Sequence, residues 1–345
     1  MSKNMLDYSQ DQLKKILINL EQPQFRAKQI REWLVKKYCS DFSKMLNLPQ
    51  KLREQLSRDY VEYPLKIKTV QRSSDNNTIK FTAQTVDNEF IEVVLLKYSY
   101  GYSVCLSTQI GCAMGCAFCA STKGGLVRNC TSTEILAQLL LAEQIVMERV
   151  GRIVLMGMGE PLHNYKEVLK FLNICKDQQW GPGIGLRHVT ISTCGIVSKI
   201  RELADQKLPV TLALSLHAPN DEIRKKIIPT AHKYSIKEII SACRYYFEQT
   251  DRRVSCEYTL IKGINDSITC ANKLVGLLKN EHMHINLIPY NTVDFLNWQA
   301  PTAKHVNDFA NVLKKANLTV TTRRRLGSDI DAACGQLRRR EQRVR

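Results

Sequence analysis

The stretch 107-STQIGCAMGCAFCASTKGG-125 determines how the rest of the chain is interpreted. Cys112, Cys116 and Cys119 lie within eight residues in the spacing C-x3-C-x2-C. Three thiolates on one loop can bind three irons of a [4Fe–4S] cubane and leave the fourth iron open to a small chelating molecule. A glycine before each of the first two cysteines lets the loop wrap closely around such a cluster. We therefore predict that these three cysteines hold one open-sited [4Fe–4S] cluster.

Three alternatives compete with this prediction. A zinc site needs a fourth Cys or His at ligand spacing, usually as a second C-x2-C pair. An electron-transfer ferredoxin uses four cysteines per cluster in a much smaller chain. Buried structural cysteines are the third alternative, and the crowding of three thiols into one loop argues against it.

Downstream and upstream of this loop, short apolar runs alternate with amphipathic helical patterns. Six such units predict a parallel sheet with right-handed crossovers. Eight units close a full barrel, so we predict a partial (βα)6 barrel of the α/β class, with its functional groups at the C-terminal ends of the strands. The apolar runs are 104–108, 152–158, 188–194, 210–216, 253–261 and 284–290, and the helical patterns are near 132–148, 164–176, 197–205, 235–249, 266–279 and 302–316.

Four segments follow from these patterns. Residues 1–62 show helical spacing of apolar side chains and form a small accessory domain that could bind RNA or could equally be only a packing cap, because periodicity does not separate the two. Residues 63–101 contain β-forming runs separated by turn-like sequences, which predicts a short antiparallel β extension. Residues 102–322 form the barrel, and residues 323–345 form a basic C-terminal segment.

The charge of the chain favours a polyanionic partner. Lys and Arg number 50 against 33 Asp and Glu, which gives a formal net charge of +17. The same excess recurs locally, because eight arginines fall within the last 23 residues. A solvated basic tail is the alternative, but the global and local excess agree, so we expect nucleic acid. These arginines are Arg323, Arg324, Arg325, Arg338, Arg339, Arg340, Arg343 and Arg345.

The sequence gives no sign of a membrane or secretory location. No apolar run approaches the roughly 20 residues that span a bilayer. The N-terminus lacks the apolar core of a signal peptide. We therefore expect a cytoplasmic protein with no membrane partner, in which clustered thiols stay reduced.

A series of motifs gives the chain a family resemblance. In order they are GCAMGCAFCAST, GMGEP, ISTCGI, SLHAPND, LIPYN and SDIDAACGQL, and they span nearly the whole chain. Together they resemble the RlmN/Cfr group of radical S-adenosylmethionine (SAM) RNA adenosine methyltransferases. The last motif is the most specific, because a generic radical enzyme has no reason to carry it.

The resemblance implies one [4Fe–4S] cluster per chain and two SAM molecules per turnover. It also implies a SAM site at the tips of the barrel strands. Taken alone, each of these side chains could serve only local capping or turn chemistry, and a structural histidine is an equal alternative at position 217. The implied SAM-binding residues are Gly159, Glu160, Ser192, Ser215, Leu216, His217 and Asn291.

The resemblance gives covalent roles to two further cysteines. Cys334 would carry a methyl group from a first SAM, and a radical made from the second would activate that methyl group. Cys105 would resolve the resulting RNA–protein crosslink through a transient disulfide with Cys334, and Glu92 would accept the ring proton. Without the resemblance, both cysteines would be interpreted as small buried apolar residues, and Glu92 as the solvent face of a strand.

The RlmN-like activity implied is methylation of C2 of an adenosine in 23S rRNA and in tRNA. A Cfr-like C8 methylation of 23S rRNA is the alternative within the family. A non-catalytic iron–sulfur protein that binds RNA or senses redox state is the alternative from another class. Thr292 and the sequence IIPTAHKY depart from the usual pattern, which bears on substrate choice. The expected partners are an external flavodoxin-type electron donor and RNA, and we expect a monomer.

Overall fold

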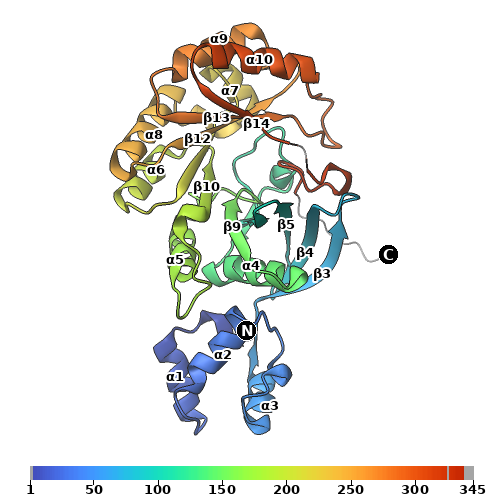
Figure 1. Ribbon diagram of the computed structural model, residues 1–345, viewed down its shortest axis with the longest axis vertical. Helices are drawn as coiled ribbons and strands as arrows, with labels where there is room; N and C mark the ends of the chain where they lie inside the picture. The colour runs from blue at the N-terminus through green and yellow to red at the C-terminus, as the bar shows by residue number, and fades with distance from the viewer. Residues whose placement is uncertain (1–2, 325, 338–345) are drawn as a thin grey trace.

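The computed structural model describes residues 3–324 and 326–337, apart from the side chains of residues 230 and 231. The N-terminal part is helical, with α1 (Gln10–Asn19), α2 (Arg26–Val35) and α3 (Gln50–Asp59). Short strands β1 (Lys3–Asn4) and β2 (Tyr60–Val61) pair in parallel and bring the two ends of this part together. Figure 1 shows these helices in blue at one end of the molecule.

A ten-stranded sheet runs through the rest of the described chain, in the order β14-β13-β12-β11-β10-β9-β6-β5-β4-β3. The strands from β3 to β6 pair antiparallel, whereas β6 and β9 to β14 pair in parallel. The predicted antiparallel extension is therefore continuous with the barrel sheet, and β6 belongs to both. The strands are β3 (Leu65–Arg72), β4 (Thr78–Thr85), β5 (Phe90–Tyr98), β6 (Gly101–Cys105), β9 (Val150–Leu155), β10 (Val189–Thr193), β11 (Thr211–Ser215), β12 (Val254–Leu260), β13 (Met283–Pro289) and β14 (Thr319–Thr322).

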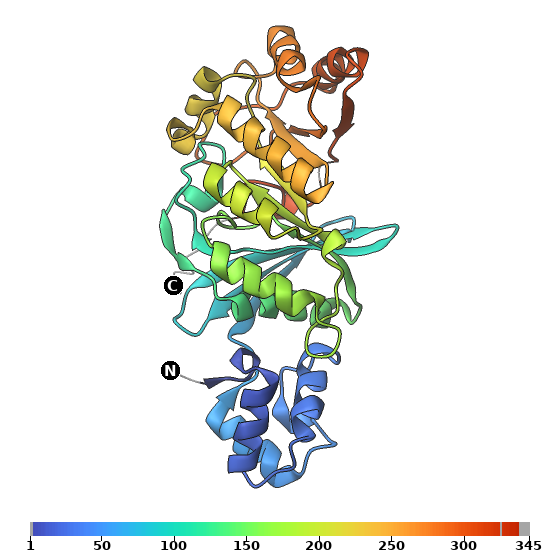
Figure 2. The ribbon, with the colours of Figure 1, turned by 90° about the vertical axis from the view of Figure 1, so that its left-hand side faces the viewer.

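Helices follow the parallel strands and cover the outer face of the sheet, so the predicted partial barrel is confirmed. Figure 2 shows α5, α6 and α8 lying side by side across this face. These helices are α4 (Ser132–Val146), α5 (Tyr165–Lys176), α6 (Val197–Asp205), α8 (Ile236–Thr250), α9 (Ile268–Leu278) and α10 (Ala303–Lys315).

The elements that were not predicted include one strand and one helix of the barrel. Strand β14 adds a further parallel strand after α10, and α7 (Asp221–Ile227) fills a connection between β11 and α8. The sequence of β14 is TVTT, in which only Val320 is apolar, so it carries no hydrophobic signal of a barrel strand. It forms a strand because its backbone pairs with β13, although its sequence lacks an apolar pattern.

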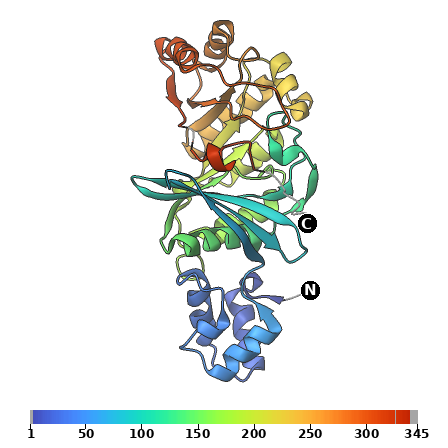
Figure 3. The same cartoon turned by 90° about the vertical axis from the view of Figure 1, so that its right-hand side faces the viewer.

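Alternation along β5 separates two faces of the sheet. Ile91, Val93 and Leu95 pack into the main core, while Val94 and Leu96 face the other side. The C-terminal segment, residues 326–337, lies over this second face, and Figure 3 shows it in red beside the cyan strands. In the part of the chain that the structure describes, no helix is long and apolar enough to cross a membrane.

Candidate active site

The three clustered cysteines lie on a loop closed by a short hairpin. Strands β7 (Gln109–Gly111) and β8 (Leu126–Asn129) pair antiparallel and hold residues 112–125 between them. The Cys112 N–H donates to the Gly125 carbonyl at 3.0 Å. Gly111 has a φ of +75°, and a Cβ at this position would lie 1.9 Å from the Gly125 oxygen. Only glycine therefore fits at the entrance of the loop.

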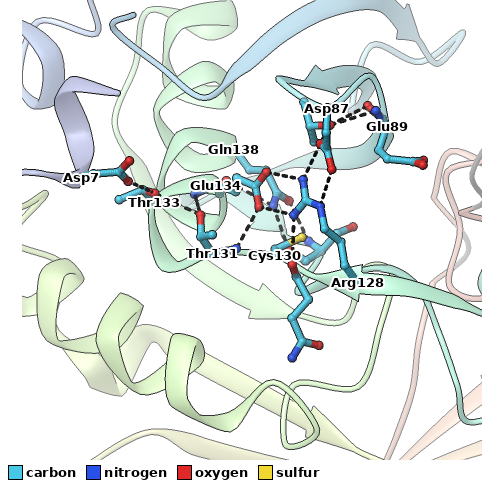
Figure 4. Close-up of polar contacts among 12 residues, drawn as sticks. Asp7, Asp87, Glu89, Arg128, Cys130, Thr131, Thr133, Glu134 and Gln138 are labelled. Atoms are coloured by element: carbon cyan, nitrogen blue, oxygen red, sulfur yellow. Dashed lines mark hydrogen bonds and ion pairs between the residues drawn. The ribbon is translucent and has the colours of Figure 1, made fainter. Parts of the chain in front are cut away.

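An arginine anchors this hairpin to the scaffold (Figure 4). The Arg128 guanidinium on β8 donates to Glu134 at 2.8 Å and to Asp87 at 2.7 Å. Glu134 also accepts from the Thr131 N–H in the capping box of α4. The two carboxylates raise the pKa of Arg128, Glu134 more than Asp87, because charge-assisted pairs favour the ionised form. The hairpin is thus clamped between the β4–β5 turn and the start of α4.

The cysteine loop forms one wall of the first cavity, which lies at the C-terminal ends of the barrel strands. This cavity contains about 970 Å³ of space, part of it open to solvent. Most of the predicted site residues line it, although they come from separate strands. They are Cys112, Cys116, Cys119, Gly159, Glu160, Ser192, Ser215, His217, Asn291 and Cys334.

Glu160 presents a buried carboxylate to the first cavity. One oxygen accepts from the Leu162 N–H at 3.0 Å and the other from the Cys194 N–H at 2.8 Å. Burial raises the pKa of Glu160, and these N–H groups oppose the rise. Gly159 has a φ of +103°, and a Cβ there would lie 2.5 Å from the Gln109 Cβ. The backbone therefore approaches the cysteine loop as closely as only glycine permits.

The remaining predicted SAM-binding residues have distinct environments. Ser192 and Ser215 lie on neighbouring strands with their hydroxyls 3.4 Å apart. His217 accepts from the Thr259 N–H at Nδ1, and burial lowers its pKa to about 3, so its ring is neutral with the proton on Nε2. Asn291 donates to the Cys334 carbonyl at 3.2 Å. Leu216 is buried in the main core and is not among the described residues that line the cavity.

A second cavity adjoins the first. Cys105 lines it at the end of β6, and Cys334 lines both cavities. Cys105 is buried, and that burial raises the pKa of its thiol to about 12. All twelve cysteines are among the described residues, and none of them forms a disulfide there. Val94, Leu96, Ala332 and Leu337 give the second cavity apolar walls. Cys334 therefore lies between the cysteine loop and Cys105.

Comparisons with known proteins agree with this geometry. The family described as "Ribosomal RNA large subunit methyltransferase N-terminal domain" matches residues 3–61, and the Radical SAM superfamily matches residues 106–269. A Clostridium botulinum protein named "Probable dual-specificity RNA methyltransferase RlmN" is 48% identical over 338 residues, which are 98% of both chains. The chain belongs to the RlmN family of radical SAM RNA methyltransferases.

Further relatives support this assignment. A protein of the same name from Alkaliphilus oremlandii is 48% identical over 337 residues, again 98% of both chains. The crystal structure of a radical SAM methyltransferase from Sphaerobacter thermophilus superposes with a TM-score of 0.93 at 38% identity, covering 97% of this chain and 98% of that one. These relatives favour neither the Cfr-like alternative nor a non-catalytic iron–sulfur protein.

Membership of the RlmN family implies a [4Fe–4S] cluster and SAM, and the first cavity fits them. The three thiols share one cavity, and burial raises the pKa of Cys112 to about 12 and that of Cys116 well above its usual value. Such thiols are neutral until a metal displaces their protons. No three His, Cys, Asp or Glu side chains in the described residues converge as ligands of a single metal ion. Asn291 Oδ1 is buried and, among the described residues, has no hydrogen-bond partner, so it offers an acceptor to a bound ligand.

Two charged residues that line the first cavity were not predicted from the sequence. Arg323 lines both cavities, and the adjacent Cys334 sulfur raises its pKa, with Glu257 adding to the effect. Glu257 is buried and accepts from Ser255 at 2.6 Å and from Asn286 at 2.8 Å. Arg323 was counted only in the basic segment, because β14, which delivers it to the cavity, has no apolar pattern. Glu257 lies in a buried strand without a motif.

Glu92 lies on the sheet face that carries Cys105, since it alternates with Val94, the cross-strand partner of Cys105. It is not among the described residues that line either cavity. Its carboxylate lies 3.8 Å from the Lys80 ammonium, and both side chains are 2% exposed. Lys80 also donates to the Asp331 carbonyl at 3.3 Å, which connects this pair to the C-terminal segment. The predicted arginines at 325, 338–340, 343 and 345 lie outside the described residues.

Proposed function

We propose that this RlmN-family chain methylates C2 of an adenosine in 23S rRNA and in tRNA, with Cys334 as the methyl carrier. The observation that carries the proposal is the position of Cys334 in both cavities. From there its sulfur can meet a SAM-derived group on one side and the Cys105 thiol on the other. The dual substrate is supported by the names of relatives that share 48% identity with the chain.

In this proposal, Cys112, Cys116 and Cys119 bind the cluster. When bound, the cluster and SAM supply a 5′-deoxyadenosyl radical at the first cavity. The chain uses two SAM molecules per turnover, one as methyl donor to Cys334 and one as radical source. Glu160 binds the SAM ammonium group, because its buried carboxylate faces the cavity. The other SAM-binding residues are Gly159, Ser192, Ser215, Leu216, His217 and Asn291.

Cys334 makes the methylation of an unreactive carbon feasible. C2 of adenine is electron-poor and bears a hydrogen, so it is a weak nucleophile toward a methyl cation. The Cys334 sulfur takes the methyl group instead, forming an S–C bond while the sulfonium C–S bond of SAM breaks. After hydrogen abstraction by the 5′-deoxyadenosyl radical, the carbon on Cys334 adds to C2, and the adduct gives up one electron, which would return to the iron–sulfur system that cleaved SAM. Glu92 then accepts the C2 proton, for which its carboxylate must part from Lys80.

Cys105 completes the proposed cycle by releasing the RNA. Its thiolate attacks the Cys334 sulfur, so that an S–S bond forms while the S–C bond to the modified base breaks, and the released carbon takes up a proton to become the methyl group. The Cys105 thiol and Cys334 line the same cavity, which supports this attack. Reduction of the Cys105–Cys334 disulfide then restores both thiols.

The other segments have supporting roles in the proposal. Residues 1–62 form an accessory RNA-binding domain, residues 63–101 a β extension, residues 102–322 the barrel and residues 323–345 the segment that carries the methyl. The net charge of +17 suits an RNA substrate. We further propose a cytoplasmic monomer that receives electrons from a flavodoxin-type donor.

Replacing the proposed resolving thiol tests the function. The Cys105→Ala variant should accumulate RNA covalently joined to Cys334 and stop after one turnover. Cys243→Ala is the matched control, because Cys243 is also a fully buried thiol and is not among the described residues that line either cavity. RNA-free Cys105→Ala protein with normal turnover would remove Cys105 from the mechanism. Mass spectrometry of 23S rRNA and tRNA from cells with and without the chain distinguishes C2 from C8 methylation.

A further inference from the structure

Three side chains at the β5–β6 turn form a continuous stack. Tyr98 and Tyr100 are nearly parallel, with an interplanar angle of 10° and ring centroids 5.0 Å apart. The Arg152 guanidinium carbon lies 4.2 Å from the Tyr100 ring centroid. We call these three side chains the aromatic ladder. None of them was assigned a role by the sequence motifs.

The aromatic ladder leads from the protein surface to the reacting sulfurs. Its inner end, Tyr98, lines the second cavity together with Cys105 and Cys334. Its outer ring, Tyr100, is 55% exposed, which is high for an aromatic side chain. Arg152 starts a row on β9 that continues through alternate residues to Met156, which lines both cavities.

The charge around the ladder suits a phosphate backbone. Arg323 and Arg324 line the second cavity, and its described lining residues include no Asp or Glu. Arg152 is exposed at the outer end of the ladder. Cations that surround exposed aromatic rings are the arrangement by which proteins hold unpaired nucleotides.

The stack of Arg152 on Tyr100 resembles a base stacked on the ring. An exposed cation–π contact contributes a factor of only about 2 to 5 to an equilibrium. Stacking of a nucleobase on an aromatic side chain contributes roughly 5- to 150-fold in affinity. A base can therefore displace the guanidinium from Tyr100, and the freed guanidinium can bind a phosphate bidentately.

We propose that the aromatic ladder binds the unpaired nucleotide adjacent to the target adenosine. The base of that nucleotide stacks on Tyr100, and Arg152 moves to its phosphate. The target adenosine then enters the cavity beyond Tyr98, beside Cys105 and Cys334. This inference rests on the proposed RNA substrate and specifies how the chain holds it. Because every base has a π face, the site tolerates different neighbours, as an enzyme with more than one RNA substrate requires.

The test measures the Kd of the cluster-loaded protein for a stem-loop RNA with an unpaired adenosine, by fluorescence anisotropy. Tyr100→Leu should weaken binding about 10- to 100-fold, and Tyr100→Phe, which keeps the ring, by less than about 2-fold. Tyr245→Leu is the matched control, because Tyr245 also carries an arginine, Arg201, at 5.2 Å but lies on the outer helix α8. Since Tyr100 is exposed, its replacement should leave iron content and thermal unfolding unchanged, and both are measured.

An abasic nucleotide completes the test as a double-mutant cycle across the interface. Removing the neighbouring base from the RNA should weaken wild-type binding as much as Tyr100→Leu does. The two changes together should cost no more than either alone, because they remove the same contact. Arg152→Gln should reduce the dependence of log Kd on log salt by about one phosphate contact.

Two outcomes would overturn the inference. One is a Tyr100→Leu variant that binds RNA as tightly as wild type. The other is additive losses from Tyr100→Leu and the abasic RNA. If Tyr100→Leu instead slows reduction of the cluster by flavodoxin at unchanged RNA affinity, the ladder is a protein-docking surface and the RNA inference is wrong. Failure of the proposed function is distinct, because wild-type protein would then bind RNA without methylating it.

Discussion

The two cavities that meet at Cys334 differ in how the chain builds them. The first is lined by a contiguous cysteine loop and by the ends of successive barrel strands. The second is made by segments far apart in the sequence, namely strands β5 and β6, the end of β13 and the C-terminal segment. In the proposed mechanism, radical generation thus depends on local motifs, whereas substrate chemistry depends on a tertiary assembly closed by the last described residues.

The cavities also differ in charge. The first is lined by the buried carboxylates of Glu160 and Glu257, which suit the cationic groups of SAM. The second is apolar and has two arginines but no carboxylate among its described lining residues, which suits an adenine ring and its phosphates. Cys334 lies where these environments meet, which is the position that the proposed methyl carrier requires.

Cys334→Ala should have the largest effect, because it should abolish RNA methylation while leaving SAM cleavage intact. We expect RNA methylation to fall by at least about 1000-fold, because no other thiol lines both cavities among the described residues. SAM cleavage to 5′-deoxyadenosine should continue with reductant, since the cysteine loop is intact. Liquid chromatography of the nucleoside products and mass spectrometry of the RNA measure both. Loss of SAM cleavage in this variant would show that the first cavity depends on Cys334 as well.

Variants of Lys80 and Glu92 test whether this buried ion pair stabilises the sheet face that carries Cys105. Lys80→Met removes the ammonium group that lies 3.8 Å from the buried Glu92 carboxylate, which should lower the free energy of unfolding by about 3–5 kcal/mol. Lys80→Met/Glu92→Gln removes both charges and should recover most of that loss. Urea unfolding of the two variants gives the comparison. Equal stability of the single variant and wild type would mean that Glu92 is protonated or paired elsewhere in the folded state.

The sequence could predict the first cavity but only part of the second. Cysteine spacing and glycine-containing motifs are local, and they correctly located the strand tips. The position of Arg323 at the cavities depends on β14, an exposed edge strand whose TVTT sequence lacks the apolar run expected of a barrel strand. The Lys80–Glu92 pair arises from strand register, which no residue pattern in either strand specifies. In the aromatic ladder, Arg152 lies 52 or more residues after the two tyrosines in the sequence. Only the pairing of β6 with β9 brings them together.

Glu160→Gln tests whether the carboxylate of Glu160 in the first cavity contributes to SAM binding. The amide has one acceptor oxygen for two N–H donors, Leu162 and Cys194, and loses the charge that attracts an ammonium group. We expect SAM affinity to fall about 10- to 100-fold. Glu143→Gln is the control, because Glu143 is a buried carboxylate on α4 that accepts from the Val150 N–H at 2.9 Å. Calorimetry on the cluster-loaded protein measures the SAM affinity of each variant. Equal SAM affinities of Glu160→Gln and Glu143→Gln would exclude Glu160 from SAM binding.

The pH dependence of RNA release tests the apolar character of the second cavity. Burial raises the pKa of Cys105 to about 12, so its thiol is almost entirely protonated near neutrality. Only the thiolate attacks sulfur, and below the pKa its fraction rises tenfold per pH unit. Release of the RNA–Cys334 adduct should therefore accelerate about tenfold for each pH unit between roughly pH 6.5 and 8.5. The adduct trapped in Cys105→Ala should show no such slope under the same conditions. A flat profile in wild type would mean that binding of RNA brings a base to Cys105 and that the second cavity does not stay apolar during turnover.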